Sequence, residues 1–485
     1  MKILMVAAEY APLAKTGGLA DAVAGLSGAL RERGHDVRVL LPKYPFLPPP
    51  GYSLRTAGDT GGPFEELVGE RPGPRVYLLE ADEFAVNTKV YAGNERDAAS
   101  FMRLSRGTVE LPGNVGWQAD VVHCHDWHTA LVPALLRARP DRRANSSGTQ
   151  RAGTTRSEHV QERAPRCLLT LHNVGYQGIF PEEIIERRGY AELGALRDEA
   201  ERSARTVNFL KLGIRYADAL TTVSPTYARE IQLPEFGMGL EDVLRARRSD
   251  LSGILNGVDY REWSPETDPF LEPHYTRPNL DGKRRIKSAL SAALDLPDDG
   301  APLIGVVTRL VWQKGIDLLA AALPALLENT PARFALLGSG DAELEQSLAD
   351  LAAHHPARVA FRRGYDEALA HRILAGADFI AVPSRYEPCG LTQLYALRYG
   401  TIPIVRATGG LADSVRAFDP GSGTGNGSVF EHADAEGLIW AVSTALGWFG
   451  DAALWPQLVN NAMQADFSWA HQAPEYEALY RQLSS

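Results

Sequence analysis

Short, almost uninterrupted apolar runs alternate with segments of helical periodicity along most of the chain. The runs of a first series are residues 3–8, 37–41, 76–79, 121–124, 168–171 and 219–223. A helical pattern over 19–33 follows the first run. Strands that are apolar on both faces are typical of parallel sheets covered by helices on either side. The pattern therefore predicts successive β–α–β units around a parallel sheet.

A second series of apolar runs begins beyond the middle of the chain. Its members are residues 303–307, 334–337, 359–361, 379–382 and 403–405. Residues 263–282, which are rich in Pro, Asp and Asn, separate the two series and are predicted to be a linker.

The two series predict an α/β protein with two doubly wound, Rossmann-like domains. We expect an N-terminal domain over 1–262, a C-terminal domain over 283–465, and a helical segment over 466–485 that returns to the N-terminal domain. Sheets of this kind bind ligands beyond the carboxyl ends of their strands. We therefore expect the two domains to face each other across a cleft that holds the site.

Composition narrows the possible partners. The 485 residues carry a formal net charge of -10, which argues against binding nucleic acid or an anionic membrane. No apolar run reaches the length of about 18 residues that a membrane span needs. The three cysteines are far apart in sequence, so neither a disulfide framework nor a structural zinc site is expected, and a reducing, cytoplasmic location is predicted.

One segment departs from the pattern of strands and helices. Residues 140–165 are polar, rich in Arg, Ser, Thr and Gly, and almost without large apolar side chains. Such a composition cannot bury enough apolar surface to offset the entropy lost on ordering. It predicts a mobile or disordered loop.

The first motif with possible chemistry is Lys15-Thr-Gly17-Gly18-Leu-Ala-Asp21, between the first strand and the first helix. Glycines let the backbone approach a ligand closely, and a helix start favours an anion. Lys15 adds a full charge, and Asp21 could cap the helix or accept sugar hydroxyls. The motif matches neither the Rossmann nor the P-loop fingerprint. An ordinary strand–helix turn remains the alternative.

The second motif is Arg309-Leu-Val-Trp-Gln-Lys314-Gly, on the loop that follows the run 303–307. Two cations on one loop could clamp a diphosphate and stabilise the negative charge that develops on it as it leaves. The alternative is a pair of surface cations, which is the usual place for Lys and Arg.

The third motif, Glu387-Pro-Cys389-Gly390-Leu391-Thr392-Gln, comes soon after the run 379–382. A carboxylate beside a glycine turn and a helix start is well placed to bind sugar hydroxyls. Taken alone, Glu387 would more simply be a helix-capping residue.

Histidines gather after two strands of the N-terminal series. His125-Asp126-Trp-His128 ends one strand, and His172-Asn173 ends another. The spacing is compatible with a metal site, but no acidic partners follow at ligand spacing. Binding sugar hydroxyls is the preferred interpretation, and a structural histidine is the alternative for each ring.

Taken in order, these motifs resemble the bacterial glycogen synthase and plant starch synthase family. The likeness runs from residue 2 to about residue 470. Its carriers are residues 15–21, 125–128, 172–173, 208–211, 221–231, 253–259, 309–314, 387–393 and 408–413. The pentapeptide Gly-Gly-Leu-Ala-Asp at 17–21 returns at 409–413. Each piece is weak alone, whereas the ordered set is specific.

The resemblance implies the two-domain glycosyltransferase B fold and a retaining glucosyltransferase. It implies ADP-glucose as donor, glycogen or a maltooligosaccharide as acceptor, and neither a metal nor an organic cofactor. By this likeness Lys15, Gly17 and Gly18 meet the nucleotide diphosphate, and Arg309 and Lys314 hold its phosphates.

The glucose contacts are implied in the same way. Glu387 and His172 contact the transferred glucose, and the main-chain carbonyl of His172 faces the anomeric carbon. Asp126 and Asn256 line the glucose and acceptor region. The remaining predicted substrate-binding residues are Asp21, Asn173, Tyr365, Cys389, Gly390, Leu391 and Thr392.

Some positions depart from relatives, and some alternatives stay open. Many proteins of the broader fold carry a second glutamate where Tyr395 stands. The family's shorter connection before the run 168–171 is replaced here by residues 140–165. Ile286 stands where the family usually has Asn. A transferase that makes sucrose, a maltosyl phosphate or a lipid-linked sugar is one rival. A non-catalytic glucan-binding module is another, although such a module needs no diphosphate clamp. The residues do not decide between ADP- and UDP-glucose.

Overall fold

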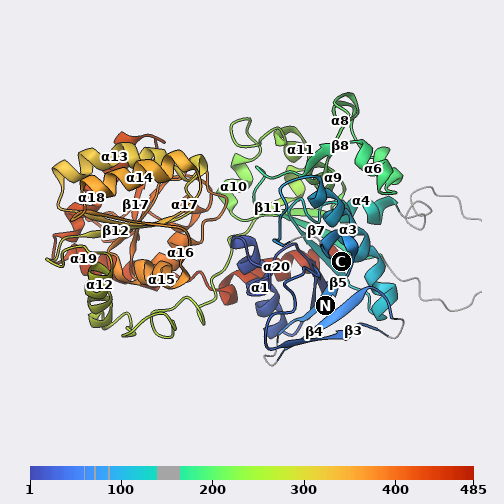
Figure 1. Ribbon diagram of the computed structural model, residues 1–485, viewed down its shortest axis with the longest axis horizontal. Coiled ribbons are helices and arrows are strands. Elements are labelled where there is room, and N and C mark those ends of the chain that lie inside the picture. Colours follow the sequence, from blue (N-terminus) through green and yellow to red (C-terminus); the bar gives the residue numbers. More distant parts are fainter. Residues whose placement is uncertain (59–60, 70–72, 86–87, 139–163) are drawn as a thin grey trace, which may run out of the picture. The chain divides into compact units, whose positions relative to one another are not determined.

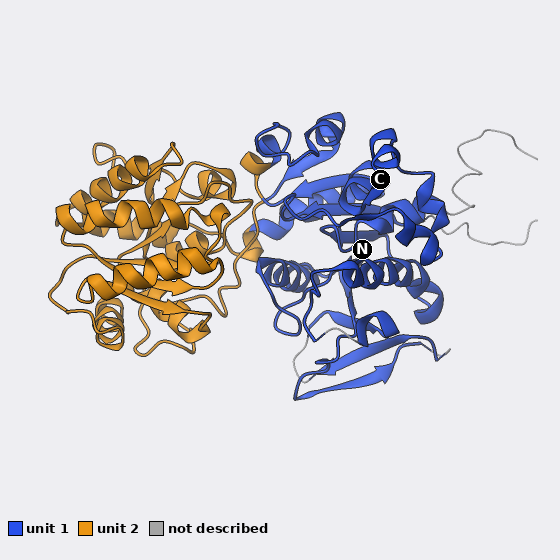
Figure 2. Ribbon diagram, turned by 45° about the horizontal axis from the view of Figure 1, so that its top comes forward, with its two compact units in different colours: residues 1–223, 228–254, 472–485 blue, residues 224–227, 255–471 orange. Residues whose placement is uncertain are grey.

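The computed structural model describes residues 1–58, 61–69, 73–85, 88–138 and 164–485. The predicted mobile segment 140–165 therefore lies almost wholly outside the described residues. The chain divides into two compact units (Figure 2). Unit 1 comprises residues 1–223, 228–254 and 472–485, and unit 2 comprises 224–227 and 255–471.

Unit 1 is built on a nine-stranded sheet in the order β11-β10-β7-β6-β1-β2-β5-β4-β3. Its strands are β1 (Lys2–Val6), β2 (Asp36–Pro42), β3 (Tyr52–Thr56), β4 (Phe64–Gly69), β5 (Arg75–Leu79), β6 (Val121–His125), β7 (Arg166–Leu171), β10 (Ala219–Thr222) and β11 (Leu251–Gly253). A separate pair joins β8 (Ile179–Pro181) to β9 (Thr206–Asn208). All pairings of the large sheet are parallel except those of β4 with β3 and β5.

The helices of this part of the chain are α1 (Gly18–Glu32), α2 (Asp82–Ala85), α3 (Glu95–Val115), α4 (Leu131–Ala138), α6 (Glu183–Arg187), α7 (Ala191–Gly194), α8 (Glu199–Ser203), α9 (Phe209–Tyr216), α10 (Pro225–Glu230), α11 (Glu241–Ala246) and the 3-10 turn η1 (Arg248–Asp250). In α1, the buried residues Leu19, Val23, Leu26 and Leu30 recur at intervals of three and four. That spacing puts them on one face of the helix.

Unit 2 is built on a six-stranded, wholly parallel sheet in the order β14-β13-β12-β15-β16-β17. Its strands are β12 (Leu303–Val307), β13 (Arg333–Gly338), β14 (Val359–Arg363), β15 (Phe379–Val382), β16 (Ile402–Arg406) and β17 (Ser428–Phe430). Its helices are α12 (Asp281–Ala293), η2 (Trp312–Lys314), α13 (Ile316–Asn329), α14 (Ala342–His354), α15 (Glu367–Gly376), α16 (Thr392–Arg398), α17 (Gly409–Ser414), α18 (Ala435–Phe449) and α19 (Leu454–Gln464). Figure 1 shows helices on both sides of this sheet.

A mostly parallel sheet in unit 1 and a wholly parallel sheet in unit 2 confirm the predicted α/β fold class. The central strands are almost entirely buried, as their continuous apolar runs indicate. The sequence pattern did not reveal β3, β4, β8, β9, β11 and β17. Most of these are only three residues long, and β3 is largely exposed.

Two of the predicted segments lie near the places where the chain passes from one unit to the other. The segment 263–282, expected to be a linker, belongs to unit 2, where Trp263 stacks on His371 and Tyr395. Helix α20 (Trp469–Ser484) begins in unit 2, and its residues from 472 onward belong to unit 1. Over the ranges that the structure describes, no single helix is long and apolar enough to cross a membrane; α18 and α19 pass that test only as a pair bent by 110°.

Candidate active site

Several predicted site residues lie in loops that follow strands at the topological switch point of each sheet, where the strand order reverses. In unit 1, β1 lies between β2 and β6, so the chain continues to opposite sides of β1. In unit 2, β12 lies between β13 and β15 in the same way. Loops diverge beyond the carboxyl ends of such neighbouring strands and leave room for a ligand. Lys15 follows β1, Asp126 follows β6, Lys314 follows β12 and Glu387 follows β15.

Lys314 and Glu387 are in direct contact in unit 2. The Lys314 Nζ lies 2.5 Å from Glu387 Oε2, and the hydroxyl of Ser384 donates to the same oxygen at 2.9 Å. Glu387 is only 5% exposed. A buried carboxylate needs such partners, because desolvation disfavours its charged form. The structure thus brings together two residues from separate motifs. Arg309 lies between β12 and Lys314 in the chain and is exposed.

The loops after β12 and β15 are tied to each other along their backbones. Arg385 forms a double ion pair with Asp317 at 2.6 Å and lies over the ring of Trp312. Gly315 has a φ of +64°, and a Cβ there would lie 2.0 Å from the carbonyl oxygen of Pro383. Only glycine allows this approach. The spacing between Lys314 and Glu387 is therefore fixed by main chain as well as side chains.

The second Gly-Gly-Leu-Ala-Asp segment supports the Glu387 loop from behind. The Gly410 N–H donates to the carbonyl oxygen of Glu387 at 3.0 Å. A Cβ on Gly409 would lie 1.9 Å from that oxygen, and one on Gly410 would lie 2.0 Å from the Cys389 oxygen. The sequence shows the repeat of the pentapeptide but gives this copy no role. Its contact with the Glu387 loop depends on how the chain folds and leaves no motif in the sequence.

Asn256 approaches the same loop within unit 2. Its backbone N–H bonds to the sulfur of Cys389, and burial raises the pKa of that thiol to about 12. Asn256 is 4% exposed, and its side-chain oxygen has no hydrogen-bond partner among the described residues. A buried acceptor of this kind is suited to a ligand that supplies a donor, such as a hydroxyl.

The other predicted residues of unit 2 border this loop more loosely. Gly390 adopts a φ of +72°, and Leu391 and Thr392, which lead into α16, are partly exposed. Tyr365 stands between β14 and α15 with 70% of its surface exposed.

In unit 1, the Lys15 loop is anchored by a residue that sequence reasoning missed. Glu9 is 3% exposed and accepts hydrogen bonds from the N–H groups of Thr16 at 2.7 Å and Gly17 at 2.9 Å, and from the Tyr91 hydroxyl. Burial raises the pKa of Glu9. The available signal was a carboxylate directly after the first buried strand.

Lys15 and Asp21 pair across the start of α1. Their Nζ and Oδ1 atoms are 2.9 Å apart and both side chains are partly exposed. Gly17 precedes the helix in an extended conformation, and Gly18 is its first residue. Asp21 thus contacts Lys15 in this structure.

Asp126 and the His172-Asn173 turn form a second group in unit 1. Asp126 adopts a φ of +57°, and its Oδ1 accepts from the N–H of His172 at 2.6 Å and more weakly from that of Asn173 at 3.4 Å. Burial raises the pKa of Asp126 to about 7. The carboxylate therefore fixes the backbone turn that carries His172.

The neighbouring imidazoles form a largely uncharged cluster, in which His123, His125 and His128 are buried and His172 is partly exposed. His172 Nε2 lies 3.1 Å from His125 Nδ1. Burial lowers the pKa of His123, His128 and His172 to about 3. In the described part of the chain these rings provide no set of three ligand atoms within 4.8 Å of one another.

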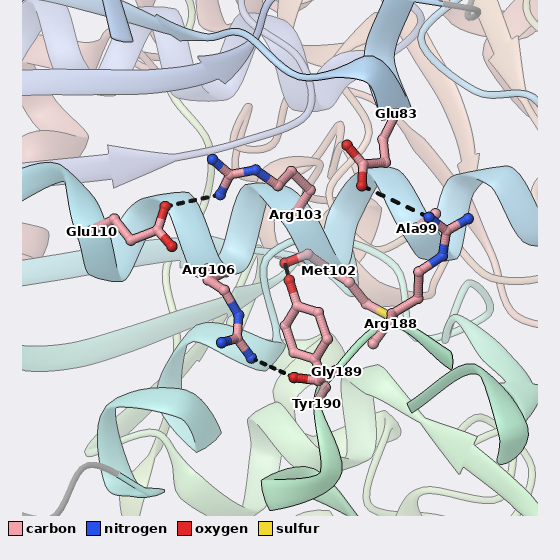
Figure 3. A pocket seen from close by; sticks show the side chains of 9 residues that line it. All are labelled: Glu83, Ala99, Met102, Arg103, Arg106, Glu110, Arg188, Gly189 and Tyr190. Atoms are coloured by element: carbon pink, nitrogen blue, oxygen red, sulfur yellow. Dashed lines mark hydrogen bonds and ion pairs between the residues drawn. The ribbon is translucent and has the colours of Figure 1, made fainter. Parts of the chain in front are cut away.

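A pocket of about 300 Å³ lies elsewhere in unit 1, along α3 (Figure 3). Arg103 pairs with Glu110 at 3.0 Å, Arg188 with Glu83 at 3.8 Å, and Arg106 with Glu192 at 2.7 Å. Because each guanidinium has a carboxylate partner, this pocket offers little surplus charge for a diphosphate. It contains none of the predicted site residues.

Comparisons with known proteins agree over the whole chain. The family model "Starch synthase catalytic domain" matches residues 2–246, and "Glycosyl transferases group 1" matches 293–447. The glycogen synthase of Anaeromyxobacter dehalogenans (strain 2CP-C) is 43% identical over 496 residues, covering 100% of both chains. That of Myxococcus xanthus is 41% identical, covering 100% of this chain and 99% of its own.

Solved structures extend this agreement to the fold. The catalytic domain of starch synthase IV from Arabidopsis thaliana, bound to ADP and acarbose, has a TM-score of 0.86 at 34% identity, with 100% of this chain and 99% of that one covered. Sucrose-phosphate synthase from Thermosynechococcus elongatus, at 21% identity and a TM-score of 0.61, shares the fold. The protein is a glycosyltransferase of the B fold and belongs to the glycogen synthase and starch synthase family.

Proposed function

We propose that the enzyme transfers glucose from ADP-glucose to the 4-hydroxyl at the non-reducing end of an α-1,4-glucan, with retention of configuration. The acceptor is glycogen or a maltooligosaccharide. One observation carries the proposal furthest: the Lys314 ammonium and the buried Glu387 carboxylate are 2.5 Å apart on loops that follow neighbouring parallel strands. A cation beside a sugar-binding carboxylate suits a substrate that joins a phosphate to a sugar.

The proposed reaction breaks the bond between the anomeric carbon and the diphosphate oxygen. A bond forms between that carbon and the acceptor oxygen on the same face, and the acceptor proton passes to the departing ADP. Negative charge grows on the phosphate during this step. Lys314 and Arg309 stabilise it electrostatically, because preorganised cations interact more strongly with a charge that develops in the transition state.

In this proposal the sugar is bound by Glu387 and Asn256 of unit 2 and by His172 of unit 1. Glu387 accepts hydrogen bonds from glucose hydroxyls, and Asn256 offers a buried carbonyl oxygen. His172 is uncharged near neutral pH, so its ring can donate or accept a hydrogen bond without repelling positive charge on the sugar. Asp126 holds the His172 turn, and Lys15 with Gly17 and Gly18 meets the diphosphate.

The choice of ADP-glucose rests on the relatives. The starch synthase IV structure contains ADP, and the curated relatives at about 43% identity are glycogen synthases. Sucrose-phosphate synthase shares the fold at 21% identity, and that likeness is too low to assign its substrates to this enzyme. The proposal requires neither a metal nor an organic cofactor for the transfer, and it places the enzyme in the cytoplasm, since none of the three cysteines, all of them described, is in a disulfide.

A donor panel tests the proposal. ADP-glucose, UDP-glucose and GDP-glucose are each incubated with glycogen or maltotetraose, and the released nucleoside diphosphate and the lengthened glucan are measured together. We expect release and extension to coincide with ADP-glucose. Efficient extension from UDP-glucose alone would overturn the donor assignment, and transfer to fructose 6-phosphate in place of glucan would overturn the acceptor.

A further inference from the structure

Unit 2 contains a second group of chemically active side chains, separate from the proposed substrate contacts. We propose that Glu262, Glu367 and His371 bind a divalent transition-metal ion, with Zn²⁺ the best match, and that the ion stabilises unit 2. One ligand atom from each of these residues lies within 4.8 Å of the other two. Ligands of one Zn²⁺ stand about 3–4 Å apart, given bond lengths near 2.0–2.2 Å, so modest side-chain rotation completes the site.

The histidine is oriented as in known metal centres. His371 and Asp268 are both fully buried, and His371 Nδ1 lies 2.7 Å from Asp268 Oδ2. Its Nε2 is also buried and has no hydrogen-bond partner among the described residues. A metal-binding histidine commonly donates its other ring N–H to a carboxylate, which fixes the tautomer and raises the basicity of the ligating nitrogen. The Asp268–His371 pair has this arrangement, and Nε2 is the nitrogen left for the ion.

The fold holds the backbone segments of the three ligands close together before any ion binds. Glu367 and His371 are four residues apart on α15, so their side chains lie on the same face of the helix. Trp263 stacks on the His371 ring at 3.8 Å between centroids and on Tyr395 at 3.9 Å. Glu262 comes directly before Trp263 in the chain. The stacked rings therefore position the imidazole and the Glu262 segment together.

The donor atoms favour a transition metal. One imidazole nitrogen with two carboxylate oxygens suits Zn²⁺ better than Mg²⁺, which prefers oxygen ligands and retains its waters. The ion would join the segment around Glu262 to α15. The competing interpretation is a structural hydrogen bond between His371 and Asp268 that needs no metal.

Metal binding to the full-length protein tests the site. The protein is treated with chelator, dialysed free of it and titrated calorimetrically with Zn²⁺, and separately with Mg²⁺. The variants are Glu262→Gln, Glu367→Gln and the two combined. Glu343→Gln is the matched control, because Glu343 is also in the first turn of a helix of unit 2 and is exposed.

The wild type and Glu343→Gln should bind one Zn²⁺ that the double variant does not bind. Each single variant should bind it at least about tenfold more weakly, since even loss of a residue that only orients a ligand costs 10–100-fold. Zn²⁺ should raise the melting temperature of the wild type and control but not of the double variant. Chelated wild type should keep its turnover of ADP-glucose at 25 °C.

Identical Zn²⁺ binding by the wild type and the double variant would overturn the proposal, because the ion would then occupy other side chains. Absence of a Zn²⁺ equivalent in the wild type would overturn it too and favour a purely structural His371–Asp268 hydrogen bond. A failure of glucosyl transfer in every sample, with Zn²⁺ binding as expected, would instead contradict the proposed function.

Discussion

The Lys314 ammonium lies against a carboxylate, so its role in catalysis can be separated from a role in folding. Lys314→Ala should lower kcat about 10²–10³-fold, or about 2.7–4 kcal/mol, as loss of a group that stabilises developing negative charge does. The change in KM for ADP-glucose should be smaller. Steady-state kinetics with maltotetraose as acceptor measure both.

Lys43→Ala is the matched control for this variant. Lys43 is also a partly exposed lysine paired with a glutamate, Glu65, at 2.5 Å, but it lies in unit 1 beside β5. Its kcat should equal that of the wild type. Wild-type turnover by Lys314→Ala would remove Lys314 from the proposed clamp and leave it as the structural partner of Glu387.

The buried histidines predict a loss of stability in mild acid. Burial lowers the pKa of His123, His128 and His172 to about 3, whereas an unfolded histidine titrates near 6.5. Their contribution to stability is therefore present above pH 6.5 and is lost as the pH falls toward 3. Asp126, with its pKa raised to about 7, has the opposite sign, because its contribution is lost as the pH rises through 7. Three histidines outweigh one aspartate, so stability should fall from pH 7 to pH 5.

Urea unfolding at pH 7, 6 and 5 measures this dependence. Each net proton taken up on unfolding contributes about 1.4 kcal/mol per pH unit. His123→Gln should reduce the slope by about one such increment, whereas the same change at the exposed His354 should not. Equal slopes for His123→Gln and the wild type would show that His123 binds protons alike in the folded and unfolded protein, so that burial does not lower its pKa.

The short helix α17 is predicted to act through the Glu387 loop that it supports. Gly410→Ala would place a Cβ 2.0 Å from the Cys389 carbonyl oxygen, so the backbone of the loop must move. A displacement of about 1 Å at a reacting group can cost about 10²-fold in rate. We expect kcat to fall by at least about tenfold while unfolding stays cooperative, as measured by kinetics and calorimetry on the same sample.

Gly447→Ala in α18 provides the comparison, because a Cβ there meets nothing within 4 Å. It should leave kcat unchanged and be neutral or slightly stabilising. If Gly410→Ala kept full activity, the loop would tolerate movement, and α17 would have no part in positioning Glu387.

The strands that could be predicted were those in which consecutive residues are apolar and buried. Runs such as 303–307 and 379–382 coincide with β12 and β15, because strands covered on both faces are apolar throughout. The β3–β4 hairpin carries no such run, since β3 is partly exposed along its length. The order of strands in a sheet differs from their order along the chain. The contact between Lys314 and Glu387 could therefore not be derived from sequence spacing alone.

Position relative to an apolar run also distinguishes the site residues that could be predicted from those that could not. Lys15, Asp126 and His172 stand in loops directly after apolar runs, where ligands are expected. Glu9 is also next to such a run, but an isolated carboxylate gives no sign that it will fold back onto the N–H groups of Thr16 and Gly17. The proposed metal-ligand group joins Glu367 and His371, which are four positions apart on α15, to Glu262, more than 100 positions earlier, so no single motif spacing covers it.

Helix α20 makes the integrity of unit 1 depend on residues far along the chain. The hydroxyl of Tyr480 lies 2.8 Å from His123 Nδ1, and both side chains are fully buried. Tyr480→Phe leaves that nitrogen without its partner, which should cost about 1–3 kcal/mol of stability. Tyr216→Phe, at a partly buried tyrosine bonded to the Leu196 oxygen at 3.2 Å, should cost no more than about 0.5 kcal/mol. Urea unfolding compares the two, and equal losses would show that the buried bond has no special weight.

The composition of the units also has a consequence for synthesis on the ribosome. Unit 2 uses residues 255–471 apart from the short strip 224–227, so its segments are all made before residues 472–485 appear. Unit 1 cannot receive Tyr480 or Glu477, which contacts Arg33 at 2.6 Å, until those late residues have left the exit tunnel. Domains made first usually fold first. Here the later unit can be completed earlier, and the nascent unit 1 must wait for the contacts that α20 makes with His123 and Arg33.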